Sequence, residues 1–281
     1  MLELPTPTAP LAHPPAPPDL LGRVEGLRAA TGGNPGSPLQ VVWADSEDDV
    51  RAAQRLRHLV FVEEMGARPK SLPGTPPGHD VDRFDAYCEH LLVRLADGDA
   101  RQVVGTYRVL TPANARRIGG YYSESEFDLT CLHPLRDHLF ELGRSCVHPN
   151  WRQGGVILAL WGALADFLRR HGMRTLIGCA SVSLRDGGYQ ATMLWRQLSH
   201  THAAPREWQV RPRRPLPAGR LDGTEAVDVP PLLRGYLRCG ARVMGPPAWD
   251  PHFNTADLPL LLRAADLPRR FAAAGISPRR A

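Results

Sequence analysis

The sequence has almost no lysine, few cysteines and no long apolar run. Lys70 is the only lysine, so nearly all positive charge is arginine, and the net charge over 281 residues is only +5. This mild and diffuse excess argues against nucleic acid as a partner. It suits phosphates, carboxylates, an acidic protein or anionic lipid, because a guanidinium binds such groups through paired hydrogen bonds. No apolar run reaches the roughly 18 residues that a membrane span needs.

The five cysteines exclude further classes of protein. Their number is odd, no two are close in sequence and no CxxC occurs, which argues against a disulfide framework and against a zinc site. The histidines show no spacing typical of metal ligands, so no metal is expected. The start of the chain lacks the layout of a signal peptide. The sequence therefore favours a cytoplasmic protein with reduced thiols.

The composition divides the chain into a core and two tails. Residues 1–38 are rich in Pro, Ala and Gly and cannot bury enough apolar surface to order themselves, so they are predicted to be a disordered tail. The core is expected to span residues 39–200. Residues 201–265 are expected to complete the same domain, and residues 266–281 to form a basic tail.

Strand and helix signals alternate irregularly along the core. Alternating or continuous apolar runs predict strands at residues 39–44, 88–97, 102–110, 138–147 and 174–180. Helical spacing predicts helices at residues 46–66, 154–172, 190–202 and 230–240, the first of them capped by Ser46. This order predicts an α/β (α+β) fold in which helices flank a mixed, mainly antiparallel central sheet.

One stretch of the core joins a strand to the longest helix through a turn with Arg and Gly. It reads "ELGRSCVHPNWRQGG", residues 141–155. Such a turn presents backbone N–H groups and the positive end of the helix dipole to an anion. Gly154 and Gly155 allow close approach, and Arg152 adds a cation. The alternative is a tight strand–helix turn with no ligand.

The same stretch resembles the acyl-CoA loop of the GNAT acyltransferase superfamily. The motif Val-x-Pro-x-x-Arg-x-x-Gly is matched by Val147, Pro149, Arg152 and Gly155. Its closing Gly or Ala is absent, since Ile157 stands there. A carrier-protein pantetheine has one phosphodiester and needs a smaller cradle than CoA, so the departure favours acyl carrier protein (ACP) as the donor. Val147, Arg152, Gly154 and Gly155 are the expected contacts of the pantetheine.

A more specific resemblance covers residues 40–260. Blocks such as "QRLRHLVFVEEMGA", "DVDRFDAYCEHLLV", "ELGRSCVHPNWR" and "WDPHFNTADL" resemble the bacterial ornithine lipid enzymes. The resemblance implies N-acylation of the α-amine of L-ornithine by a 3-hydroxyacyl-ACP, giving lyso-ornithine lipid. It implies a GNAT-like fold and no metal or redox cofactor, with the phosphopantetheine thioester as co-substrate.

The acyl-homoserine-lactone synthases show a more distant resemblance, which implies the site residues. That family has a helix Arg and Phe, an Asp-x-x-Asp, a strand Arg and a Glu-x-x-Arg, and the matching positions of this chain are Arg57, Phe61, Asp82, Asp85, Arg108, Glu141 and Arg144. The attacking amine must lose a proton, and Glu141 is the expected base, with Arg144 beside it. Residues three apart on a flat strand face opposite sides, so both serve one site only if the strand bulges, which Gly143 permits. The alternative is a structural ion pair within the sheet.

Ornithine brings two ammonium groups and a carboxylate, which require acids and an arginine. Asp82 and Asp85 are the expected partners of the amines, and Arg57 or Arg108 of the carboxylate, with Phe61 also in the binding site. Solvated loop acids and a surface arginine are the alternatives. Glu124 and Glu126 are further acidic candidates.

Several alternatives stay open. Cys146 adjoins the site as a conceivable acyl-thioester nucleophile, although a small residue filling the sheet is the simpler interpretation. A basic, Pro-rich stretch and an apolar, basic segment at residues 260–271 suit contact with acidic ACP or peripheral contact with anionic lipid of the inner membrane, the alternative being a solvated basic surface. The basic stretch consists of Arg206, Arg211, Arg213, Arg214 and Arg220. The acceptor could be another amine, as in autoinducer synthesis, and a non-catalytic acyl-ACP or lipid-binding protein is the rival from a different class.

Overall fold

The computed structural model describes residues 39–95, 102–152, 155–217 and 227–266. All of them belong to one compact unit, Gly32–Ala281. Of the tails predicted at residues 1–38 and 266–281, only Asp266 is described, and Gly154 also lies outside the described residues.

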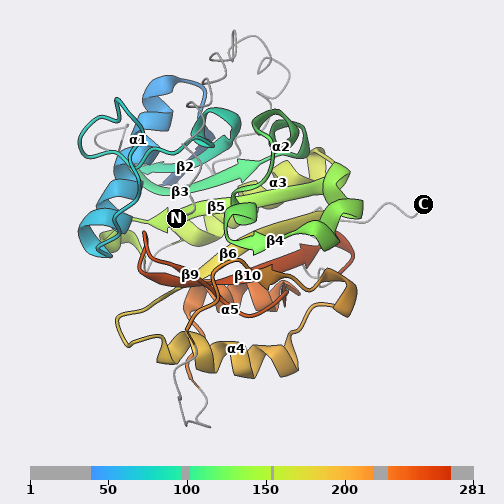
Figure 1. Ribbon diagram of the computed structural model, residues 1–281. Coiled ribbons are helices and arrows are strands. Elements are labelled where there is room, and N and C mark those ends of the chain that lie inside the picture. Colours follow the sequence, from blue (N-terminus) through green and yellow to red (C-terminus); the bar gives the residue numbers. More distant parts are fainter. Residues whose placement is uncertain (1–38, 96–101, 153–154, 218–226, 267–281) are drawn as a thin grey trace, which may run out of the picture. The chain divides into compact units, whose positions relative to one another are not determined.

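An eight-stranded sheet forms the centre of this unit, in the order β1-β2-β3-β5-β6-β10-β8, with β9 also paired to β10 (Figure 1). Neighbouring strands are antiparallel except β5 and β6, which run parallel. The mixed, mainly antiparallel sheet predicted from the sequence is thereby confirmed. Its strands are β1 (Leu39–Trp43), β2 (Glu89–Leu95), β3 (Val103–Leu110), β5 (Leu139–Val147), β6 (Thr175–Ser183), β8 (Arg242–Val243), β9 (Ala248–Asp250) and β10 (Thr255–Arg263), while β4 (Phe127–Asp128) pairs separately with β7 (Arg211–Pro212).

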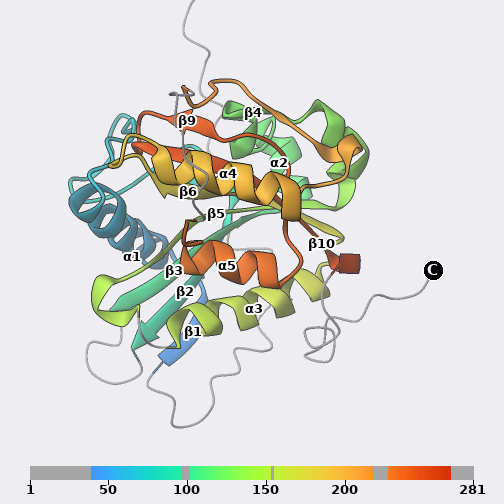
Figure 2. The same ribbon diagram turned by 90° about the horizontal axis from the view of Figure 1, so that it is seen from below.

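Helices cover both faces of the sheet. α3, α4 and α5 pack on one face of the sheet and α1 packs on the other (Figure 2). Ser46 caps α1 as predicted, and the helix then continues in π-helical form over His58–Glu64. The helices are α1 (Glu47–Arg57), α2 (Pro112–Ile118), α3 (Val156–Arg170), α4 (Tyr189–Thr201) and α5 (Pro231–Arg238).

The two faces of the sheet follow from strand alternation. In β2, Leu91 and Val93 pack in the same cluster as α3, whereas Leu92 between them packs against α1. The same alternation in β6 turns Leu176 and Ala180 toward α3, α4 and α5, and Ile177 and Cys179 toward the opposite face. Alternate residues along β6 therefore point to opposite faces of the sheet.

The apolar segment considered as a lipid contact begins within a buried strand and becomes exposed only at Ala265 and Asp266 in its described part. Leu258, Leu260 and Leu261 lie in β10, between β6 and the short strands β8 and β9, and all three are buried. The sequence concealed this strand because Pro259 interrupts it. Pro259 lies between the stretch of β10 paired with β9 and the stretch paired with β8.

The only parallel pair of the described sheet separates part-way along its length. β5 and β6 are paired from Leu139 to Leu142, but no β6 partner is present for the later residues of β5, although β5 continues to Val147. Gly178 lies at the point of separation, where an added Cβ would stand 2.7 Å from the carbonyl oxygen of Leu142. Glycine at this position lets the strands meet closely just before they part.

Candidate active site

A cavity of about 990 Å³ passes through the gap between β5 and β6. Residues 143–147 of β5 form one wall and residues 179–182 of β6 the other. Because adjacent residues of a strand point to opposite faces, this lining reaches both faces of the sheet. The cavity therefore has two chemically different ends that meet where the strands separate.

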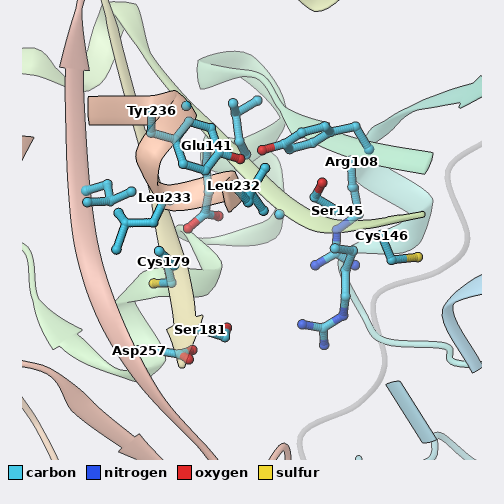
Figure 3. Close-up of a pocket in the computed structure, with 18 of the residues that line it drawn as sticks. Arg108, Glu141, Ser145, Cys146, Cys179, Ser181, Leu232, Leu233, Tyr236 and Asp257 are labelled. Atoms are coloured by element: carbon cyan, nitrogen blue, oxygen red, sulfur yellow. The ribbon is translucent and has the colours of Figure 1, made fainter. Parts of the chain in front are cut away.

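The end on the α3 and α5 face is apolar. It is lined from α3 by Trp161 and from α5 by Leu232, Leu233 and Tyr236 (Figure 3). The rings of Trp161 and Tyr236 stack with centroids 5.5 Å apart. An added Cβ on Gly235 would lie 1.9 Å from the Trp161 ring, so only glycine allows α5 to approach α3 this closely. This end suits a hydrocarbon chain.

A bulge in β5 turns two polar side chains into the cavity. Thr106 pairs with Cys146 and Arg108 with Gly143, so Tyr107 between them opposes two residues, Arg144 and Ser145. Arg144 adopts φ 51°, in the left-handed region that is rare for residues other than glycine. The bulge predicted between Glu141 and Arg144 lies instead at Arg144 and Ser145, because residues 141–143 keep regular pairing with β3, and both Glu141 and Arg144 line the cavity.

Glu141 is buried and held by three hydrogen bonds. The backbone N–H of Tyr122 donates to Oε2 at 2.7 Å, while the N–H and hydroxyl of Ser123 donate to Oε1 at 2.7 and 2.6 Å. Burial raises the pKa of Glu141, although the Ser123 and Tyr122 donors oppose the shift. A fixed carboxylate with a raised pKa is suited to accept a proton.

Beside it lies a buried network of arginines and aspartates. Arg57 is completely buried and donates to both oxygens of Asp85 at 2.9 and 2.7 Å. Arg108 donates to Asp85 at 2.8 Å and to Asp82 at 2.6 Å, and Arg144 pairs with Asp82 at 3.0 Å. Burial alone would raise the pKa of Asp85, but Arg57 and Arg108 hold it far below its usual range. These carboxylates remain ionised and bound to the protein's own cations.

The network separates the predicted substrate contacts into two groups. Phe61 and Arg108 line the cavity, and Asp82 lines a smaller cavity of about 220 Å³ beside it. Arg57 and Asp85 line neither cavity and satisfy each other. The geometry therefore favours a structural role for these two residues, in place of the predicted contact with substrate.

The predicted anion turn lies at another edge of the cavity. Val147 and Arg152 line the cavity, and Gly155 is the N-cap residue of α3. The exposed Arg152 guanidinium is bound by both carboxylate oxygens of Glu64, at 2.7 and 2.6 Å. An anion binding at this turn would therefore compete with Glu64 for Arg152.

Cys146 is unsuited to nucleophilic catalysis. Burial raises the pKa of its thiol to about 12, so the reactive thiolate is scarce at neutral pH. The side chain packs in the cluster beneath α1, next to Ala53 and Leu92. This position agrees with the simpler interpretation, a small residue that fills the sheet.

A second acidic group was missed by the sequence reasoning. Asp257 of β10 and Asp250 of β9 line the large cavity, and Glu126 lines the smaller one together with Asp250. All three side chains are buried. Burial beside Asp257 and Asp250 raises the pKa of Glu126 to about 9. Glu126 stood out only as a weak candidate, and the buried acids of β9 and β10 carried no sequence signal.

The same group is connected to Glu141. The Ser123 hydroxyl, which donates to Glu141, lies 3.7 Å from the Cys179 sulfur, and this sulfur lies 3.7 Å from Oε2 of Glu126. Figure 3 shows Glu141, Cys179, Ser181 and Asp257 in succession along the cavity. The polar end of the cavity thus runs from Glu141 to an acidic chamber formed by Glu126, Asp250 and Asp257.

Comparison with known proteins agrees with this architecture. Residues 56–162 match the family described as Acetyltransferase (GNAT) domain. An L-ornithine N(alpha)-acyltransferase of Rhodobacter capsulatus is 38% identical over 237 residues, covering 79% of this chain and 89% of the relative. One of Brucella abortus is 36% identical over 247 residues, covering 83% and 87%. The chain belongs to the L-ornithine N(alpha)-acyltransferase family.

A solved structure similar to this chain is that of a CoA-dependent acyl-homoserine lactone synthase, BjaI, with MTA. It is 18% identical with a TM-score of 0.46, and the match covers 83% of this chain and 84% of that chain. As a family member with a GNAT domain, the protein is an acyltransferase. The divided cavity with Glu141 at its junction is its candidate active site.

Docking of ACP on the basic stretch and peripheral contact with lipid both remain predictions. Arg206, Arg211, Arg213 and Arg214 are exposed, as a docking surface requires, and Arg220 lies outside the described residues. Within the described part of the chain, no helix is both long and apolar enough to cross a membrane. Peripheral contact with lipid stays a prediction.

Proposed function

We propose that this acyltransferase moves a 3-hydroxyacyl group from ACP to the α-amino group of L-ornithine, producing lyso-ornithine lipid. One observation supports this above all. A single cavity crosses the sheet, with an apolar end between α3 and α5, a polar acidic end, and Glu141 where the two meet. A long acyl chain fits the apolar end, and a small charged amino acid fits the polar end.

The reaction is a direct aminolysis. Glu141 accepts a proton from the α-amine, whose nitrogen then attacks the thioester carbonyl carbon and forms the amide bond. The carbon–sulfur bond breaks with its electron pair on sulfur, and the proton held by Glu141 passes to this sulfur, which leaves as the thiol of the carrier's phosphopantetheine. Backbone N–H groups of residues 145–147, where β5 has no partner in β6, are the proposed donors to the oxyanion. No covalent acyl-enzyme is formed.

Arg144 is the proposed partner of the acceptor's carboxylate. Its guanidinium lies 4.9 Å from the centre of the Tyr122 ring and 4.7 Å from that of Phe253, so its position is fixed from two sides. It lines both cavities, and its buried Nε atom lies 3.4 Å from Oδ2 of Asp80 but forms no hydrogen bond in the described residues. Arg108, which binds two aspartates, holds this arrangement in place.

The carrier protein is proposed to bring the thioester on a flexible arm. Arg152, with Val147 and Gly155, would receive the phosphodiester at the start of α3. The exposed arginines of residues 206–214 would meet the acidic face of ACP.

The test is an acylation assay with purified protein, 3-hydroxyhexadecanoyl-ACP and a panel of labelled amino acids. A lipid-soluble product from ornithine is expected, together with release of one carrier thiol for each amide formed. A product from a different amine alone would overturn the acceptor. No product from any amine would overturn the proposed function as a whole.

A further inference from the structure

In the described part of the chain, the acidic chamber lacks the arginines that pair with other buried aspartates. Asp80, Asp82 and Asp85 each pair with arginines. Among the described residues, Glu126, Asp250 and Asp257 form no ion pair with any arginine, lysine or histidine. Asp257 accepts from the Thr255 hydroxyl at 3.0 Å, and Asp250 accepts from the N–H groups of His252 and Phe253. Neutral donors alone leave this buried site electrostatically incomplete.

Both cavities open onto this uncompensated group. Asp257 faces the large cavity, Glu126 faces the small one, and Asp250 lines both. Asp80, 1% exposed, also lines the small cavity, and neither of its carboxylate oxygens accepts a hydrogen bond in the described part of the chain. Arg57 pairs with Oδ2 of Asp80, so Oδ1 is the oxygen left without a described partner. A buried acceptor of this kind calls for a donor that enters from outside.

We propose that the acidic chamber of Glu126, Asp250 and Asp257 binds the side-chain ammonium of the acceptor and so selects an amino acid with a terminal amine. The inference rests on the proposed function and identifies the residues that decide its acceptor. With the α-carboxylate at Arg144 and the α-amine at Glu141, the side chain extends along Cys179 and Ser181 toward Asp257 (Figure 3). A primary ammonium offers three donors, enough to meet several carboxylates at once.

The raised pKa values of two acids in the chamber also suit a cation that binds and leaves in each catalytic cycle. Burial beside Asp257 and Asp250 raises the pKa of Glu126 to about 9, and burial raises that of Asp257. Without a ligand, Glu126 and Asp257 therefore hold a proton between them, which limits the cost of burying two carboxylates. An arriving ammonium replaces that proton.

The donor atoms also suit a metal ion in their spacing. One oxygen each of Glu126 and Asp257 and the sulfur of Cys179 lie within 4.8 Å of one another. However, burial holds the pKa of Cys179 well above its ordinary value, which keeps the thiol protonated and a poor metal ligand. The ammonium is therefore the better occupant, and metal dependence becomes an outcome of the test.

The experiment compares two acceptors that differ only at the end of the side chain. L-Ornithine carries the terminal ammonium, and L-norvaline has the same carbon chain without it. With the ACP donor, kcat/KM for ornithine is expected to exceed that for norvaline by about 100-fold or more, as for a charge-assisted contact in a buried site. Equal use of both acceptors would overturn the inference and leave the proposed function standing. Failure to acylate either acceptor or any other amine would instead overturn the proposed function.

Variants test the chamber itself. Asp257→Asn and, separately, Glu126→Gln are expected to lower kcat/KM for ornithine about 10- to 100-fold while leaving norvaline within about threefold. A purely structural role would lower both acceptors alike, which would overturn the inference. Asp128→Asn, an exposed acid on β4 close to Glu126, is the matched control and should change neither value. Loss of activity on chelation, restored by a divalent metal, would also overturn it.

Discussion

Ser123 donates two hydrogen bonds to a single oxygen of Glu141, one from its backbone N–H at 2.7 Å and one from its hydroxyl at 2.6 Å. Tyr122 donates one to the other oxygen. A carboxylate offers roughly four acceptor positions, so about one remains open, on Oε2. Glu141 is therefore rigidly oriented yet still able to accept a proton.

Replacing Glu141 by Gln should remove the base. We expect kcat to fall about 10²- to 10⁴-fold with little change in KM for the acyl donor. Steady-state kinetics measure the effect, and thermal unfolding checks that the variant folds. Ser123→Ala, which keeps the carboxylate and removes one donor, serves as the comparison and should lose much less activity. A Gln variant as active as wild type would contradict the role of Glu141.

Acceptor preference should depend on pH through the acidic chamber. Asp257, Asp250, Tyr122 and Cys179 face Glu126, whose pKa of about 9 means that the free site holds a proton at neutral pH. A bound ammonium favours the ionised form, so binding releases that proton, and the affinity for ornithine rises as pH increases toward about 9. The ornithine-to-norvaline ratio of kcat/KM isolates this effect, because both acceptors share the α-amine.

The same ratio should depend less on pH in Glu126→Gln, because the group with the pKa of about 9 is then absent and only Asp257 can hold a proton. The range from pH 6 to pH 9 covers neutral pH and the raised pKa of Glu126. A wild-type ornithine-to-norvaline ratio that does not change over this range would mean that the chamber releases no proton when ornithine binds.

Breaking the buried pair of Arg57 and Asp85 should affect stability more than acceptor recognition. Asp85→Asn removes the carboxylate that pairs with both Arg57 and Arg108, so that these buried guanidinium groups keep only Asp80 and Asp82, and unfolding should become easier by at most about 3–5 kcal/mol. Since Arg57 and Arg108 lower the pKa of Asp85, its contribution is present at neutral pH and is lost as pH falls below about 4. Urea denaturation measures both effects.

The surface pair of Glu47 and Arg51 provides the control for that measurement. Glu47→Gln should cost no more than about 0.5 kcal/mol, because both side chains are exposed. An Asp85→Asn protein that keeps wild-type stability but loses ornithine binding would instead assign Asp85 to the substrate.

The contact between Gly235 and Trp161 should govern the acyl chain. In Gly235→Ala the new methyl group collides with the Trp161 ring, which forces the ring or α5 to move at the apolar end of the cavity. We expect kcat/KM with a long-chain donor to fall about tenfold and shorter chains to be relatively favoured. Gly162→Ala on α3 is the control, since an added Cβ there meets nothing within 4 Å. An unchanged chain-length profile would place the acyl chain elsewhere.

Arg152 should act on the donor alone. Arg152→Ala is expected to raise KM for acyl-ACP about tenfold, as for the loss of one charge-assisted contact, with kcat and the KM for ornithine unchanged. Glu64→Gln removes the competing carboxylate, so KM for acyl-ACP should fall. If both variants behaved like wild type, the phosphodiester would not bind at this turn.

The sequence by itself determined the order and type of most elements. Apolar periodicity and the cap at Ser46 specify α1, α3 and the strands β1, β2, β3, β5 and β6, because these signals depend on neighbours a few residues away. The need for a bulge in β5 was equally local, since residues three apart on a flat strand cannot share a face. The strand β10 escaped this reasoning because Pro259 interrupts its apolar run.

Only the tertiary structure decided which charged residues face the cavity. Arg57 and Asp85 match the expected spacing, but they form an ion pair with each other instead of facing the cavity. The packing of α1 against the sheet brings them together. Glu126, Asp250 and Asp257 come from three separate segments, and the pairing of β9 with β10 and the approach of residues 122–126 bring them together. Charge and burial act through space, so a chamber built from distant segments leaves no pattern along the chain.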